Sequence, residues 1–362
     1  MALIGFASAD SFSEWEVYGD AWKATNDTHT IVKWNQTGEH TWIATGNAST
    51  IDYLAVAGGG YGGIYAGSGG GAGGLLTGTI PVNGIINVTV GTGGTSEGAN
   101  GGNSTLDDLN AIGGGAGARG GGDGAGDPPK IGGSGAGGSS KTGRTIGAAG
   151  IAGQGYKGGD SPGQSGVYGS GGGGGAGGLG INAISTTGGN GGPGLQSAIT
   201  GEALWYAGGG GGGQYSGVAS GIGGSGVGGN GATVAGTSTK GMDGRGGGGG
   251  GSGGAGDTER DGGSGVIIIS YVTPFAPIAS FNLVLTDTTT GAPTSWQWNA
   301  TNLLGNNTPV TISTDQNPIV TLTQGNWLID LIATNDLGSD TCNSTIGINL
   351  TSPQVYFWER TS

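Results

Sequence analysis

The side chains of this sequence that could do acid–base or nucleophilic chemistry are few and scattered. The 362 residues include two histidines, His29 and His40, and one cysteine, Cys342. A nucleophile needs a base and an orienting group within reach, and the sequence places no such partners near either histidine. We therefore expect surface or strand histidines, a buried Cys342 that packs as a small hydrophobic residue, and no catalytic residues. One cysteine also excludes a disulfide framework and a cysteine-rich zinc site.

Acidic residues form short clusters in glycine-rich surroundings, at Asp107-Asp108 and at residues 257–261. Neither cluster has the repeated spacing of a calcium-binding repeat. A phosphate-binding loop needs Gly-Lys followed by Ser or Thr, and the dipeptide Gly-Lys does not occur. We interpret the clusters as solvated loop charges and predict no metal and no cofactor. A cation held by one of the acidic loops stays an open alternative.

Tyrosines beside glycine runs are the residues best suited to recognition. Tyrosine offers a flat apolar face and a hydroxyl group at low entropic cost, which suits contact with a saccharide or a protein. The candidates for contact with an external partner are Tyr61, Tyr65, Tyr156, Tyr168, Gln214 and Tyr215. The alternative is that these side chains only pack at the borders of the glycine-rich region.

The elements that must position these residues are set by the glycine distribution. Glycine supplies 95 residues, and all but nine lie between residues 58 and 265. Charged residues make up 10% of the chain and the net charge is −13. An acidic balance argues against nucleic acid or an anionic membrane as partner, because both attract basic surfaces. No apolar run reaches the length of a membrane span.

Short β-branched and aromatic runs frame the glycine-rich region. Residues 30–34, 40–44 and 51–56 precede it, and residues 266–272 follow it. Such runs, separated by turn-forming residues, predict antiparallel strands. We expect a β-rich attachment or assembly region over residues 1–45 and a glycine-rich domain over 46–273.

Apolar residues also recur inside the glycine-rich region. The pair 74–82 and 85–90, with Asn83-Gly84 between them, predicts a β-hairpin. Residues 109–112, 179–184 and 203–206 are apolar segments between glycine runs, and we expect them to act as packing anchors.

Two structures compete for the glycine runs themselves. A flexible linker would have this glycine content, but a linker has no reason to avoid charge or to be framed by strands. The alternative is an array of polyglycine II helices, with three residues per turn and no internal hydrogen bonds. Their N–H and C=O groups must then bond to neighbouring helices, and a Cβ atom would hold those neighbours apart. The chain reversals would carry the bulkier residues.

A family resemblance favours the array. Five segments resemble the glycine-rich domain of bacteriophage tail-associated proteins: 52–60, 69–76, 88–91, 101–104 and 262–269 (Gly-Gly-Ser-Gly-Val-Ile-Ile-Ile). More distantly, the region is similar to the polyglycine II tips of T-even-like phage adhesins. The resemblance implies that loops at the reversals contact a host receptor, either a saccharide or an outer-membrane protein.

The C-terminal part resembles a PKD domain, which is an Ig-like β-sandwich. After a proline-containing linker at 274–278, residues 279–352 carry the resemblance, mainly through Trp296-Gln297-Trp298 and residues 324–335. Residues 299–302 depart from the Phe-Gly-Asp stretch that is usual in that family. Alternation places Trp296 and Trp298 on one face, and Trp327, Ile329 and Leu331 on one face of another strand.

The last ten residues, 353–362, are too aromatic for a solvated tail. We expect Tyr356, Phe357 and Trp358 to dock on a partner or on another subunit. The first residues lack the basic start and the apolar length of a secretory signal, so we expect a chain without a cleaved leader.

Together these patterns predict an all-β protein with an irregular glycine-rich middle: a strand-framed polyglycine II array followed by an Ig-like (PKD) sandwich. The resemblance implies a non-enzymatic virion component, a tail fibre or tail-tip adhesin that is made in the host cytoplasm and acts at the host cell surface. Other virion proteins and further copies of the chain are the expected assembly partners, and a homotrimer fits. The alternatives are a head fibre or capsid decoration protein, a bacterial surface adhesin and, last, a polysaccharide-cleaving enzyme.

Overall fold

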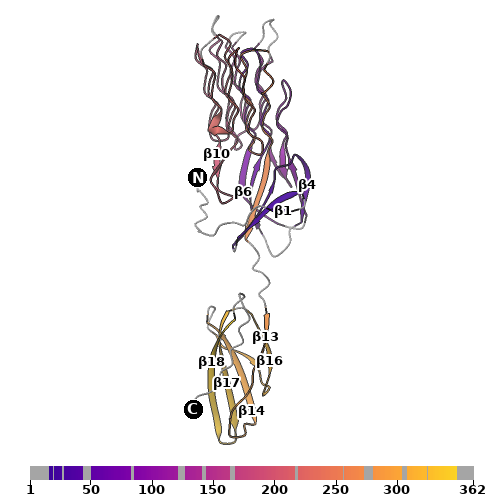
Figure 1. Cartoon of the computed structure of the whole chain (residues 1–362), viewed down its shortest axis with the longest axis vertical. Coiled ribbons are helices and arrows are strands. Elements are labelled where there is room, and N and C mark those ends of the chain that lie inside the picture. The colour runs from indigo at the N-terminus through magenta and orange to yellow at the C-terminus, as the bar shows by residue number, and fades with distance from the viewer. Residues whose placement is uncertain are drawn as a thin grey trace. The chain divides into compact units, whose positions relative to one another are not determined.

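The computed structural model describes residues 16–18, 20–26, 28–43, 50–82, 85–120, 127–140, 144–163, 168–216, 219–255, 257–272, 280–303, 308–323 and 325–348. The chain divides into two compact units, residues 1–274 and 275–362. Apart from one 3-10 turn, η1 (Gly224–Gly226), the regular elements of the described residues are β-strands (Figure 1). The predicted all-β class is therefore confirmed. Within these residues, no helix has the length and hydropathy needed to cross a membrane.

Two antiparallel sheets form the base of the first unit. The six-stranded sheet has the order β1-β2-β3-β12-β5-β6 and contains β1 (Glu16–Tyr18), β2 (Ala21–Thr25), β3 (His29–Trp34), β12 (Val266–Val272), β5 (Thr50–Val56) and β6 (Leu75–Pro81). The second sheet has the order β4-β7-β8-β9 and contains β4 (Gly38–Ile43), β7 (Ile85–Val90), β8 (Ser104–Leu106) and β9 (Leu109–Ala111). One apolar core joins them, in which the rings of Trp42 and Tyr271 lie 5.5 Å apart.

The four consecutive apolar residues at the start of β12, Val266–Ile269, are explained by the fact that both faces of the strand are covered. Ile267 and Ile269 pack into the core between the two sheets, whereas Val266 and Ile268 pack under the hairpin of β10 (Leu195–Ser197) and β11 (Leu204–Tyr206). A strand that is covered on both faces needs apolar residues at every position.

The strand pairing differs from the sequence-based expectations in two places, at a domain boundary and at a hairpin. Strands β2 and β3 belong to the same sheet as β5 and β12, so the boundary predicted at residue 45 falls inside one unit. The predicted hairpin does not form either, because β6 pairs with β5 along seven residues while β7 pairs with β4 along six. Each strand thus finds a full-length partner in a different layer.

The glycine-rich segments extend from the sheets as passes that run side by side (Figure 1). In the pass 67–74, every third N–H group donates to the same neighbouring pass. Gly67, Gly70 and Gly73 donate to the carbonyls of Ser252, Gly249 and Gly246; Ser68, Gly71 and Gly74 to those of Ala118, Gly115 and Ile112; and Gly69 and Ala72 to those of Gly171 and Gly174. One pass is therefore bonded to three others.

The pass 207–215 repeats this arrangement with different partners. Gly209 and Gly212 donate to Gly192 and Gly189, Gly210 and Gly213 to Gly70 and Gly67, and Gly211 and Gln214 to Gly229 and Ala232. The backbone bonds lie between passes that are distant in sequence. The described glycine runs are therefore an ordered, laterally bonded array and not a tether.

Asparagine side chains complete the array at its border. Asn190 and Asn230 lie on outer passes, and their Oδ1 atoms accept the N–H groups of Ile222 at 2.8 Å and Gly223 at 2.9 Å. Asn182 accepts the N–H of Asp160 in the same way, at 2.7 Å. A side-chain amide oxygen thus takes the place of the carbonyl that a further pass would supply.

Replacing Asn190 by alanine should therefore open the border locally. We expect faster amide exchange at Ile222 and a loss of about 1 kcal/mol, the usual net worth of one such bond. Asn190→Asp retains the acceptor oxygen and should keep Ile222 protected. Unchanged exchange at Ile222 in Asn190→Ala would contradict this role for the side chain.

The second unit contains two further sheets. Strands β13 (Ser280–Val284) and β16 (Ile319–Thr323) pair with each other, and the four-stranded sheet has the order β15-β14-β17-β18, with β15 (Val310–Ser313), β14 (Ser295–Asn302), β17 (Gly325–Asn335) and β18 (Gly338–Ile348). Trp298, Ile329 and Leu331 are buried in its core, with Trp296 and Trp327 packed against them. The predicted faces of these two strands are confirmed.

Cys342 is exposed, which corrects the expectation that it is buried. It lies on β18, opposite Leu331 of β17, at the edge of the sheet. Among the β18 side chains that the structure describes, Ile346 alone packs against the core cluster. The linker 274–278 and the segment 353–362 with Tyr356, Phe357 and Trp358 lie outside the described residues, so the docking of that segment stays a prediction.

Candidate functional site

The passes reverse direction at the end that lies away from the sheets (Figure 1). Residues 64–66, 184–187 and 233–236 form described reversals, and other passes end or begin nearby. Backbone bonds join these points: the N–H of Ala66 donates to Gly253 O at 3.1 Å, and that of Gly120 to Ile64 O at 2.9 Å. We call the resulting end of the array the distal surface. It combines parts of the chain that are far apart in sequence.

Two of the predicted tyrosines, Tyr168 and Tyr215, contact each other at the distal surface, and a third, Tyr65, lies at another of its reversals. The rings of Tyr168 and Tyr215 meet edge to face with centroids 5.7 Å apart, and the Tyr215 N–H donates to Tyr168 O at 3.3 Å. Tyr65 lies at the reversal 64–66, where its φ is +53°, and the Arg119 guanidinium lies 5.3 Å from its ring centroid. A non-glycine residue in this left-handed region is strained unless its surroundings hold it.

Aliphatic side chains extend this aromatic group. Ile184 is 64% exposed, Val234 is 49% exposed and Tyr215 is 43% exposed. The Gln214 Nε2 donates to Ser185 O at 3.4 Å, and Gln214 also bridges to Thr233, so the reversals that carry these side chains are neighbours. We expected residues 179–184 to act as packing anchors, but Leu179, Ile181 and Ile184 are all exposed. The signal for an exposed residue here was an isoleucine between glycine runs. A single apolar residue has no repeat pattern, so the sequence could not show whether its side chain faces solvent.

Two of the predicted contact residues, Tyr61 and Gln214, are buried and therefore do not belong to the candidate binding surface. Tyr61 is 7% exposed, and the Arg260 guanidinium lies 4.9 Å from its ring centroid. Burial raises the pKa of the Tyr61 hydroxyl above its ordinary value. Gln214 is fully buried and supports the reversals from beneath. Both residues therefore pack inside the glycine-rich array and present almost no surface to a partner.

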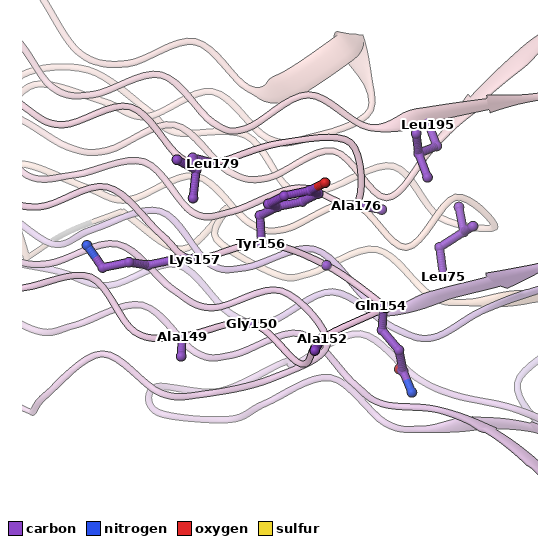
Figure 2. A pocket seen from close by; sticks show the side chains of 12 residues that line it. Leu75, Ala149, Gly150, Ala152, Gln154, Tyr156, Lys157, Ala176, Leu179 and Leu195 are labelled. Atoms are coloured by element: carbon purple, nitrogen blue, oxygen red, sulfur yellow. The ribbon is translucent and has the colours of Figure 1, made fainter. Parts of the chain in front are cut away.

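Tyr156 lies apart from the distal surface, in a lateral cavity of about 540 Å³ (Figure 2). The cavity lies near the sheets, because Leu75 of β6 and Leu195 of β10 line it together with Ala176 and Leu179. The Gln154 amide group also lines the cavity, but its polar atoms are engaged: Oε1 accepts the Ile112 N–H, and Nε2 donates to the Asn110 carbonyl. What remains is a largely apolar hollow that contains the half-exposed ring of Tyr156 and is also lined by the charged side chain of Lys157.

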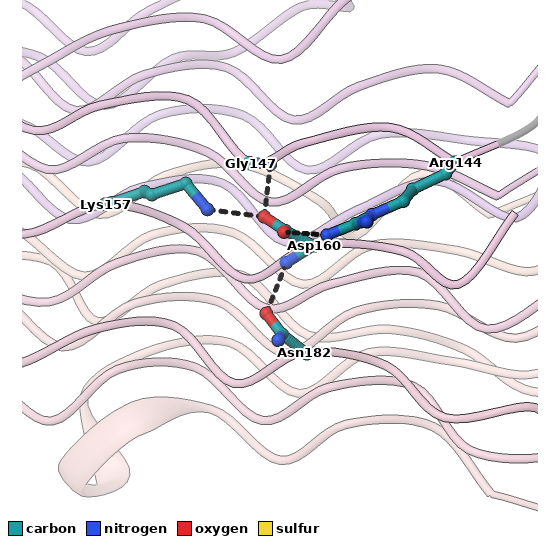
Figure 3. A network of polar contacts seen from close by, with 5 residues as sticks. All are labelled: Arg144, Gly147, Lys157, Asp160 and Asn182. Atoms are coloured by element: carbon teal, nitrogen blue, oxygen red, sulfur yellow. Dashed lines mark hydrogen bonds and ion pairs between the residues drawn. The ribbon is translucent and has the colours of Figure 1, made fainter.

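A carboxylate network lies beside that cavity (Figure 3). Asp160 accepts hydrogen bonds from Lys157 Nζ at 2.5 Å, Gly147 N–H at 3.0 Å and Arg144 Nη2 at 3.3 Å. Burial by itself would raise the pKa of the Asp160 carboxyl, but the hydrogen bonds from Lys157 and Gly147 outweigh it and hold the pKa below its ordinary value. The carboxylate thus ties the pass of Arg144 and Gly147 to the pass of Lys157 and Asp160, and the Asp160 N–H links a third pass through Asn182.

Acid should weaken this network. A carboxyl whose folded-state pKa is lowered stabilises the fold above the unfolded-state pKa of about 4, and this contribution is lost as the pH falls through the folded-state pKa. Asp160→Asn should lower the free energy of unfolding by about 1–2 kcal/mol at neutral pH, and its difference from the unmodified chain should shrink below pH ~4. Denaturation at several pH values measures this, with exposed Asp108→Asn as control. A pH-independent difference would contradict the assignment.

The acidic segment 257–261 was predicted to carry solvated loop charges, but its first residue, Asp257, is buried and hydrogen-bonded. Asp257 is 8% exposed; it accepts the N–H groups of Ser238 at 2.8 Å and Glu259 at 3.2 Å. Burial alone would raise its pKa, but these bonds to Ser238 and Glu259 lower it. Within the described part of the chain, no group of three His, Cys, Asp or Glu side chains is placed to hold a metal ion.

The histidines lie on strands, as expected. His40 of β4 contacts the Asp20 carboxylate at 2.6 Å and the Gln36 carbonyl at 2.9 Å, and His29 begins β3.

The fold and the distal surface define a class of protein: an all-β chain in which laterally bonded glycine passes, framed by strands, present reversals at one end. The chain belongs to the glycine-rich domain family, whose sequence profile matches residues 35–272. The match begins just after β3 and ends at the end of β12, so it includes the four-stranded sheet and strands β5, β6 and β12 of the six-stranded sheet. No curated protein and no solved structure matches the chain.

Proposed function

We propose that this chain is a non-enzymatic adhesin of a bacteriophage virion, in a tail fibre or at the tail tip, whose distal surface binds a receptor on the host cell. The observation that carries the proposal is the convergence of distant reversals on one hydrogen-bonded end that exposes Tyr215, Ile184 and Val234. Exposed apolar and aromatic groups gathered in this way are typical of interaction sites.

We infer that the passes are polyglycine II helices. The three-residue repeat of donor directions in the passes 67–74 and 207–215 supports this, because polyglycine II has three residues per turn and all of its bonds are lateral. Such an array would hold the reversals rigidly, and a rigid surface loses less conformational entropy when it binds.

The chemistry of the distal surface suits a saccharide or an uncharged protein loop. Tyrosine rings stack on apolar sugar faces and also donate hydrogen bonds. The net charge of −13 disfavours strongly anionic partners. The second unit, for which we propose a PKD-type Ig-like fold, would serve as a spacer or a contact module. Display of several copies would raise the avidity of a weak single site.

Competition for adsorption tests the proposal. Purified chain should bind cells of the host and slow phage adsorption in proportion to its concentration. Binding to cells that lack the receptor, or no binding together with a location on the capsid shell, would contradict it.

A head fibre or capsid decoration protein is the second candidate. The strand-rich second unit, with its own core, supports it, because such modules also suit a capsid surface. A count of copies per particle and a position in a virion reconstruction separate the two candidates.

A further inference from the structure

Strand β18 is a long, regular edge strand. Its eleven residues pair with β17 from Gly338 opposite Asn335 to Ile348 opposite Gly325, with no shift of register. On its other side, β18 has no partner strand among the described residues. An edge strand of this kind presents a row of N–H and C=O groups that another strand can pair with. One of them, the Thr341 N–H, donates to Asp340 Oδ1 at 2.9 Å, and a partner strand would replace this local bond.

The strand lacks the usual protection against such pairing. It contains no proline, no lysine or arginine, and one charged residue, Asp340. Among the other described edges, β6 ends in Pro81 and β4 has six residues with Glu39 and His40. The remaining edge strands, β1, β9, β10, β11, β13, β15 and β16, have five residues or fewer. Pairing at β18 would therefore satisfy more backbone groups than pairing at any of these strands.

We propose that β18 pairs antiparallel with β18 of a second copy, so that two four-stranded sheets join across a two-fold axis at Cys342. A two-fold axis perpendicular to the sheet keeps both cores on the same side and uses the same surface twice. In this register Thr341 lies opposite Asn343 of the second copy, and Asp340 lies opposite its Ser344. No like charges are opposite each other, which would otherwise oppose pairing.

Charge and length favour a second copy as the occupant. The two Asp340 side chains would be four residues apart along the paired strands, about 13 Å, which exceeds the screening length of ~8 Å at physiological salt. In this register residues 338–346 of one copy lie opposite residues 346–338 of the other, so nine of the eleven residues of each β18 find a partner. The exposed side chains of Thr341, Cys342 and Asn343 are uncharged, so their burial beside a partner strand carries a small desolvation cost.

Cys342 provides a direct reporter, since it is the single cysteine of the chain. The full-length chain should sediment as a dimer of the 34.6 kDa protomer at high concentration, and mild oxidation with diamide should link the copies through Cys342. A chain that stays monomeric up to its solubility limit, or a dimer that diamide does not cross-link, would overturn the proposal.

Charge variants of two facing positions separate pairing from folding. Thr341→Lys with Asn343→Lys places lysine opposite lysine twice, and we expect at least a tenfold weaker dimer. Thr341→Lys with Asn343→Glu places lysine opposite glutamate at the same positions and should dimerise as the unmodified chain does. Equal dimerisation of the two variants, with unchanged circular dichroism, would also overturn the proposal, whatever the result of the receptor assay.

Discussion

Replacing Gly210 by alanine should unfold the glycine-rich unit. Gly210 donates its N–H to Gly70 O at 2.9 Å, and a Cβ atom built on it would lie 2.0 Å from the carbonyl oxygen of Gly249. An ordinary contact needs more than an ångström of additional space, so two passes must separate. The shift would stretch neighbouring lateral bonds as well, each worth about 1 kcal/mol. We expect a loss of about 4 kcal/mol or more, which is exceptional for one methyl group.

Gly236→Ala is the matched control. A Cβ atom at Gly236 would meet its nearest atom, Thr233 Oγ1, at 3.4 Å, an ordinary contact. This variant should unfold at nearly the same temperature as the unmodified chain. Thermal unfolding and amide exchange across the passes measure both. Equal stability of the Gly210 and Gly236 variants would show that the passes are not packed as closely as the structure describes.

Truncating the distal surface should abolish most receptor binding while leaving the fold intact. Tyr215→Ala combined with Ile184→Ser removes an aromatic face and an aliphatic side chain that are 43% and 64% exposed. Loss of a central tyrosine in an interface typically costs 2 kcal/mol or more. We therefore expect affinity for host cells to fall about 30-fold or further, measured with labelled protein.

Ile222→Ser provides the control for position. Ile222 is also 64% exposed, but it lies just before η1 and not at the reversals that form the distal surface. It should bind cells like the unmodified chain. If Ile222→Ser lost binding and the distal variant retained it, the receptor surface would lie on the side of the array.

Single strands and their faces were predictable because side-chain alternation is local. The residues Trp296, Trp298, Ile329 and Leu331 lie on the predicted core faces, since a strand with one buried face repeats every two residues. The partners of strands were not predictable in the same way. The Asn83-Gly84 turn signal predicted a hairpin, but β6 and β7 each pair along their full length with a strand of a different sheet, β5 and β4.

Exposure was the least predictable feature of the candidate site. Tyr61 and Tyr215 have the same side chain and similar glycine-rich neighbours, yet one is buried and the other is 43% exposed. Their difference depends on the passes that surround them, and Arg260, which covers Tyr61, is nearly two hundred residues away in sequence.

By itself, the sequence determined that the middle of the chain packs through its backbone, because runs without Cβ atoms can approach one another closely and leave N–H and C=O groups to be satisfied laterally. Only the tertiary structure decided which pass bonds to which and which reversals meet. Glycines are identical to one another and carry no side-chain pattern that could specify a neighbour. The choice is made instead by the framing strands and by border residues such as Asn190, Asp160 and Gln214, which fix the order of the passes and thereby place Tyr215 and Ile184 on one surface.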